Sequence, residues 1–302
     1  MGHRHSEHEK IYGNLHVFYI SFDLDDNGDY VQIKSEFYDE LFNDITSFAF
    51  GAKNVMSRIK EPQDITRIQR EALRKIYSIP EIKEASDYYL NSNIVEDKYL
   101  KRGEFGELML YHLLHEYFNA EALISKIYFK DSNGLAPHGF DAVHVDSNNR
   151  LLWLGESKLY KDGNKAINAL MRDLEEHFNR NFFREEFTII TNRVHDSNME
   201  VDEFIKYLID PETKVLDKLA KINVALFAGF DSKAISDKNK NQLQFREKLN
   251  EEIKRLYNKV EQKRKQHKWN ERLNLYLFLF PLDSKNEFVK DLHCKLKGAQ
   301  KL

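Results

Sequence analysis

The chain has 302 residues, of which 41% are hydrophobic, 13% aromatic and 31% charged. This content of core-forming residues excludes disorder over most of the length, which suffices for one large domain or two ordinary ones. The longest apolar run, 273–280, is interrupted by Asn274 and is too short to cross a bilayer, and no secretory signal follows Met1. The single cysteine, Cys294, excludes an intramolecular disulfide. We expect a soluble, cytoplasmic protein with no membrane span.

The formal net charge is −3, whereas dedicated nucleic-acid binders are usually basic. A nucleic-acid function would therefore need a local basic surface, bound cations, or a partner protein that provides most of the affinity for the nucleic acid. Residues 233–272 are one such basic segment, with thirteen Lys and Arg against six Asp and Glu. A solvated helix face and a nucleic-acid surface both explain this segment.

The first third of the chain predicts an N-terminal α/β region, residues 1–98. Its sequence contains no motif that indicates a particular chemical function. The elements expected there are a mobile arm over 1–10, a strand over 15–24, a turn at 25–28, a short strand over 30–33, and helical segments over 37–48 and 65–76.

Residues 99–302 predict a second α/β domain. Up to residue 192 the pattern indicates helix, strand, tight turn, strand, helix and strand. The remainder predicts a strand over 223–230, a charged helix over 241–266, a strand over 273–280 and a closing helix.

The segment with chemical content is a predicted hairpin. Strand-like residues 139–145 and 151–158 flank a polar cluster of Asp, Ser and Asn. If the turn centres on 148–149, Asp141 lies opposite Glu156, with the two Cβ atoms about 4.5–5.5 Å apart. Lys158 lies on the same face, because side chains alternate along a strand. A slip of one residue would separate the faces.

Two like charges opposite each other among apolar neighbours are costly unless something compensates them. A divalent cation does so, since Mg²⁺ takes oxygen ligands and is commonly held by one or two carboxylates together with phosphate and water. Asp141 and Glu156 are therefore candidate ligands for Mg²⁺ or Mn²⁺.

A third carboxylate comes from the preceding helix. Glu107 shares a helical face with Leu110, Leu114 and Phe118, so it is either a paired structural residue or part of a site. We expect Glu107 to point inward and to complete the metal cluster or bind a second ion. Glu104, three residues earlier, is the alternative.

An aspartate, then Glu-x-Lys on the next strand, with a glutamate on a helix upstream, is the arrangement of the PD-(D/E)xK nucleases. The motifs resemble those of the HamA family, nuclease subunits of the Hachiman anti-phage defence system. The resemblance spans roughly residues 99–295. It rests on RGEFGE at 102–107, HGFD at 138–141, GESK at 155–158, the segment 223–232 and the strand ending at 281–282. Phe140 stands where the superfamily's name has proline.

This resemblance implies a restriction-endonuclease-like mixed sheet flanked by helices, with an N-terminal α/β extension. It implies that Asp141 and Glu156 are the catalytic acids and Lys158 the catalytic lysine of a Mg²⁺-dependent deoxyribonuclease that leaves 5′-phosphate ends. It also implies a helicase partner like HamB, which senses nucleic acid and controls the nuclease.

Three more residues are candidates for contact with substrate. Lys161 and Lys165, after the motif, are placed to meet DNA phosphates, although solvated lysines at a helix start are equally ordinary. His138 is a possible phosphate contact or a turn residue. The alternative function is a non-catalytic interaction subunit, in which the same charges dock a helicase or nucleic acid without hydrolysis.

Overall fold

The computed structural model describes residues 5–76, 95–125, 139–196, 201–238 and 244–300. Its centre is a sheet of seven strands in the order β1-β2-β9-β8-β7-β6-β5. These strands are β1 (Ser6–Tyr12), β2 (Leu15–Ile20), β5 (Glu121–Ser125), β6 (Ala142–Asp146), β7 (Leu151–Leu159), β8 (Ile222–Asp231) and β9 (Asn274–Leu282). A separate two-stranded ribbon pairs β3 (Phe22–Leu24) with β4 (Tyr30–Gln32).

The sheet is mixed. The strand β8 runs parallel to both β7 and β9, and β2 runs parallel to β9, whereas β1 and β2 pair antiparallel, as do β5, β6 and β7. Parallel strands that are covered on both faces appear in the sequence as continuous apolar runs. The strand β8 is such a strand, because nine of its ten residues are buried. The strands predicted over 223–230 and 273–280 are thus confirmed.

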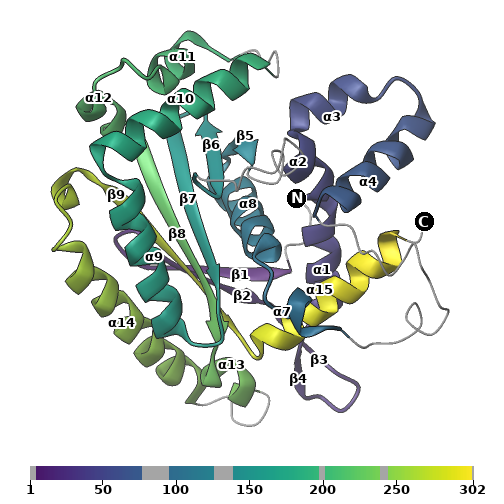
Figure 1. Cartoon of the computed structure of the whole chain (residues 1–302). Coiled ribbons are helices and arrows are strands. Elements are labelled where there is room, and N and C mark those ends of the chain that lie inside the picture. The colour runs from purple at the N-terminus through teal and green to yellow at the C-terminus, as the bar shows by residue number, and fades with distance from the viewer. Residues whose placement is uncertain (1–4, 77–94, 126–138, 197–200, 239–243, 301–302) are drawn as a thin grey trace.

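Helices cover both faces of this sheet (Figure 1). On one side lie α9 (Gly163–His177), α10 (Arg180–Asp196) and α14 (Phe245–Arg264); on the other lie α1 (Lys34–Asn43), α2 (Ile45–Phe50), α8 (Glu104–Phe118) and α15 (Lys285–Gln300). The remaining described helices are α3 (Ala52–Arg58), α4 (Pro62–Ile76), α7 (Asp97–Leu100), α11 (Glu203–Ile209), α12 (Val215–Leu219), α13 (Lys233–Lys238) and the short η3 (Asn270–Arg272). The expected α/β class, a mixed sheet flanked by helices, is confirmed.

Two helices position the predicted site. The first eleven residues of α8 are all buried, because this helix lies between the sheet and the N-terminal helices. It packs closely on β7 at Gly155, where a Cβ atom would come within 2.7 Å of Leu110. On the other face, the Asp162 side chain caps α9 by accepting hydrogen bonds from the backbone N–H groups of Asn164 and Lys165.

The structure corrects three of the expected elements. The single strand expected over 15–24 is wrong, since Leu15–Ile20 form β2 of the central sheet and Phe22–Leu24 form β3 of the separate ribbon. The arm predicted over 1–10 is wrong for residues 6–10, which belong to β1. This strand is at the sheet edge; Glu7 and Lys10 are exposed, whereas Ser6 is buried. The strand expected before residue 192 is wrong, since α10 occupies that segment. Its buried residues Phe183, Phe187, Ile190 and Val194 follow helical spacing.

The division of the chain at residue 98 stays a prediction. The strands β1 and β2, from the N-terminal side of that boundary, belong to the same sheet as the later strands. Across the described ranges, no helix combines the length and the apolar character needed to span a membrane.

Candidate active site

The hairpin has the register that the sequence predicts. Ala142 pairs with Gly155, and the Asp141 backbone N–H donates to the Gly155 carbonyl at 2.9 Å. Asp141 therefore precedes β6 by one residue and lies level with Glu156 on β7. The four residues of the turn end at Arg150, whose φ of 52° lies in the left-handed region.

The Asp141 carboxylate is buried and held by the neighbouring strand. Its Oδ2 accepts hydrogen bonds from both the backbone N–H and the hydroxyl of Ser157, each at 2.8 Å. Two donors on one oxygen fix the orientation of the carboxylate and offset part of the cost of its burial.

Glu156 is 2% exposed, and its Oε1 lies 2.6 Å from Nδ1 of His177 on α9. Burial raises the pKa of Glu156 to about 7, and the Asp141 charge adds to this shift, whereas His177 and Lys158 oppose it. Burial lowers the pKa of His177, but its hydrogen bond and charge interaction with Glu156 outweigh this, so the net shift is upward. The two side chains thus share a buried proton-sensitive contact.

Lys158 points to the same helix. Its Nζ lies 2.5 Å from Oδ2 of Asp173, one turn before His177 on α9. Burial lowers the pKa of Lys158, but the hydrogen bond to Asp173 and the charges of Asp141, Asp173 and Glu156 outweigh it and raise the pKa overall. Lys158 is therefore held as a cation beside the carboxylates.

A pocket of about 730 Å³ joins several of the predicted residues. Its lining includes Glu107, Asp141 and Lys158, and also Ser157, whose hydroxyl holds Asp141. Four further cationic side chains line it: Lys101, Arg102, Lys161 and Lys285. Glu156 and Lys165 are not among the lining residues. The pocket therefore combines two buried carboxylates, and the exposed carboxylate of Asp97, with five cations.

The two glutamates of α8 differ in their surroundings. Both lie in the first turn of the helix and both are buried. Glu107 lines the pocket, whereas Glu104 accepts a hydrogen bond from Nε of Arg102 at 3.0 Å. The positive end of the helix dipole favours both carboxylates there.

The remaining residues predicted to contact DNA lie at the surface or outside the described residues. Lys161 and Lys165 are both exposed, and only Lys161 lines the pocket. His138 lies outside the described residues.

Sequence reasoning did not find Asp173 and His177. They stand four residues apart on the inner face of α9, among the buried apolar residues that pack it on the sheet. Two polar side chains at this spacing on an otherwise apolar helix face are a signal that could have singled them out. Which strand residues they meet depends on tertiary packing.

The donor set fits a hard divalent cation. Mg²⁺ is commonly held by one or two carboxylates plus phosphate and water, and Glu107 and Asp141 present two buried carboxylates to one pocket. The carboxylate oxygens of Glu107, Asp141 and Glu156 do not all lie within 4.8 Å of one another. Among the described residues, Asp44, His115 and Glu116 do have ligand atoms this close together.

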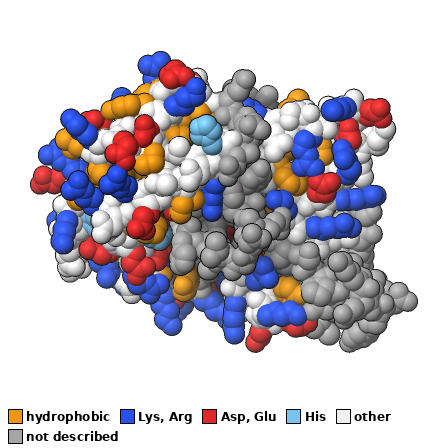
Figure 2. Space-filling model, turned by 45° about the horizontal axis from the view of Figure 1, so that its top comes forward, with side chains coloured by type: hydrophobic (Ala, Val, Ile, Leu, Met, Phe, Trp, Pro, Cys, Tyr) orange, Lys and Arg blue, Asp and Glu red, His pale blue; other side chains and the backbone are white. Residues whose placement is uncertain are grey.

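The charged surface is mixed. On the face in Figure 2, Lys and Arg side chains lie among Asp and Glu side chains. In the basic segment, α14 buries an apolar stripe and exposes charged residues, among them Arg246, Lys254 and Arg255. The exposed charged residues of α14 therefore lie on its solvent-facing side.

The whole chain, and not the hairpin alone, carries a family signature. No curated protein and no solved structure matches the chain. The family model described as HamA matches residues 3–296 of the 302. This match includes the N-terminal strands, the hairpin with Asp141 and Glu156, the helices α8 and α9, and α15 as far as Leu296. The chain therefore belongs to the HamA family.

Proposed function

We propose that this protein is a Mg²⁺-dependent DNA nuclease that acts in Hachiman anti-phage defence under the control of a helicase partner. Membership of the HamA family supports the defence role. The observation that carries the nuclease proposal is the single pocket in which Glu107, Asp141 and Lys158 meet beside four further cations.

Asp141, Glu156 and Glu107 would hold Mg²⁺ or Mn²⁺ at this pocket, Glu156 through the carboxylate oxygen that does not contact His177. When bound, the ion would polarise the scissile phosphate and lower the pKa of a bound water. Lys158 positions the attacking water and stabilises the extra negative charge of the transition state. Lys101, Arg102 and Lys161 attract the DNA backbone, each as a point of phosphate contact along the pocket. Lys285 is buried and its ammonium donates to the Leu100 carbonyl, so it adds positive charge to the pocket wall.

Asp173 and His177 of α9 hold Lys158 and Glu156 in position. Asp173 holds the ammonium of Lys158 in place and protonated, and His177 fixes one oxygen of Glu156. Both are positioning residues, since they act on DNA only through the side chains that they orient.

Dependence on a helicase agrees with the charge of the chain. A net charge of −3 gives little general attraction for DNA, so a partner that binds and opens nucleic acid would supply most of the affinity. The HamB-like helicase is the partner that the family implies, and residues 1–98 are the region that we propose to contact it.

The test is plasmid degradation by the chain with its helicase partner in Mg²⁺. Glu156→Ala and Lys158→Ala should abolish cleavage while the far-ultraviolet circular dichroism stays native. Lys206→Ala is the matched control, because Lys206 is an exposed lysine of α11 that neither lines the pocket nor belongs to the predicted DNA contacts. Full activity in both Glu156→Ala and Lys158→Ala would refute the proposal.

One observation favours the rival, a non-catalytic subunit that docks a helicase or nucleic acid. Glu156 and Lys158 are each already paired with a side chain of α9, as the charges of a purely structural site would be. A docking subunit should be indifferent to Mg²⁺ and Mn²⁺, whereas the nuclease should bind them and gain thermal stability.

A further inference from the structure

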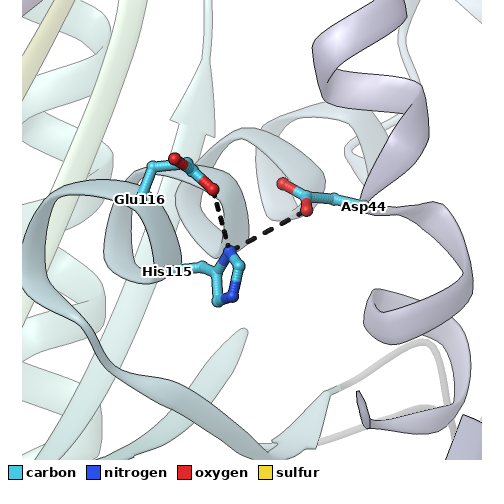
Figure 3. Close-up of side chains that lie close together, drawn as sticks. All are labelled: Asp44, His115 and Glu116. Carbon is cyan, nitrogen blue, oxygen red and sulfur yellow. Dashed lines mark ion pairs between the residues drawn. The ribbon is translucent and has the colours of Figure 1, made fainter. Parts of the chain in front are cut away.

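A second cluster of metal-ligating side chains lies outside the proposed active site. His115 and Glu116 come from the last turn of α8, and Asp44 stands between α1 and α2 (Figure 3). The His115 Nδ1 atom lies 3.2 Å from Glu116 Oε1 and 3.9 Å from Asp44 Oδ1. One ligand atom from each residue lies within 4.8 Å of the other two. None of the three lines the pocket of Glu107 and Asp141.

These separations suit a bound transition-metal ion. Ligand atoms about 2.0–2.2 Å from a tetrahedral ion are about 3.4 Å from one another. The two separations at His115 Nδ1 lie on either side of this value. The His115 side chain is 42% exposed, so it can close the remaining gap without disturbing the core.

A second observation is the residue behind Asp44. His112 is 1% exposed, and its Nδ1 lies 2.7 Å from Oδ2 of Asp44. The other oxygen of the same carboxylate, Oδ1, is the one that faces His115. A carboxylate that binds metal through one oxygen is typically fixed by a hydrogen bond to the other. The buried His112 fixes Asp44 in this way, and the Nε2 atom of His112 lies 3.7 Å from Oε1 of Glu40.

The cluster adjoins a hollow at His115, which Asp44 and Glu116 do not line. This hollow of about 180 Å³ is lined by His115 together with Tyr111 and Glu121. An ion at His115 would thus have an entry path, room for water and a further carboxylate in the same hollow.

We propose that Asp44, His115 and Glu116 form a binding site for a divalent transition-metal ion of the Zn²⁺ type. The imidazole ligand favours such an ion over Mg²⁺, which prefers oxygen ligands alone. The ion would join the α1–α2 junction to the end of α8, the helix whose first turn carries Glu107. This site stands independently of the nuclease proposal.

The test measures Zn²⁺ binding to the full chain by calorimetry and by thermal unfolding. The protein is first stripped of metal and is then kept in excess Mg²⁺. We expect one Zn²⁺ per chain and, at a hundredfold excess over the dissociation constant, a rise in melting temperature of roughly 4 °C. His115→Ala and Glu116→Gln should each weaken binding by at least about tenfold. His195→Ala is the matched control, because His195 is another exposed helical histidine.

Two results would overturn the site. One is wild-type affinity in His115→Ala. The other is loss of binding in His8→Gln alone, which would assign the ion to the His8–His16 pair, whose ring nitrogens lie 2.8 Å apart. A Co²⁺ spectrum adds a check: a thiolate charge-transfer band would place the ion at Cys294, whereas nitrogen and oxygen ligation gives only visible d–d bands.

Discussion

The ion pair between Lys158 and Asp173 can be measured by a double-mutant cycle. Its atoms are 2.5 Å apart, and the two side chains are 21% and 13% exposed. A hydrogen bond to a charged group contributes about 1.5–3 kcal/mol, and an exposed ion pair about 0–1 kcal/mol. Since both groups keep some contact with solvent, we expect a coupling of about 1.5 kcal/mol between Lys158→Met and Asp173→Asn.

The assay is urea unfolding of the four proteins, monitored by two probes whose coincidence confirms a two-state transition. The same variants separate positioning from fold. Asp173→Asn keeps the lysine and should slow cleavage by up to about 10²-fold, because Lys158 is then held less firmly. Additivity of the two unfolding effects within about 0.3–0.5 kcal/mol would refute the pairing that the structure shows.

Three further outcomes follow from buried or metal-binding groups. Lys218 is 1% exposed, and burial lowers its pKa from 10.5 to about 8, so the folded chain resists its charged form. Lys218→Met should therefore raise stability at pH 7, by at most roughly 3 kcal/mol, and the gain should vanish as the pH rises through 8 to 10.5; melting temperatures at pH 7 and 10 test this. Burial lowers the pKa of His144 from 6.5 to about 4, so native stability should fall as the pH drops from 6.5 to 4, with a smaller slope in His144→Gln by urea unfolding at each pH. Chelation with EDTA should abolish plasmid cleavage, and added Mg²⁺ or Mn²⁺ should restore it; cleavage that persists in EDTA would contradict a metal-dependent reaction.

The register of the central hairpin was open to prediction because its determinants are local. Alternating side chains and a polar turn fix which residue of one strand faces which residue of the other, so Asp141 could be placed level with Glu156. The buried strands β8 and β9 were likewise visible as apolar runs.

Other features depend on packing that no local pattern contains. The partners of Glu156 and Lys158 come from α9, and only the way that this helix lies on the sheet brings His177 and Asp173 to them. The edge strand β1 is polar, so it lacks the apolar alternation of a half-buried strand. In α10 the β-branched residues Thr188, Ile189 and Ile190 favour a strand locally, but the packing of its apolar face gives a helix.

Thermal unfolding with and without Mg²⁺ or Mn²⁺ measures whether the carboxylates of this pocket hold a divalent cation, on which the proposed nuclease reaction depends. We expect the ion to raise the melting temperature of the native chain until the site is saturated, and we expect this rise to be lost in Asp141→Asn. This variant keeps an oxygen that can accept the Ser157 hydrogen bonds, so the fold is retained. Equal responses of the native chain and Asp141→Asn, or no response in either, would contradict a metal-binding pocket and leave the docking subunit as the function.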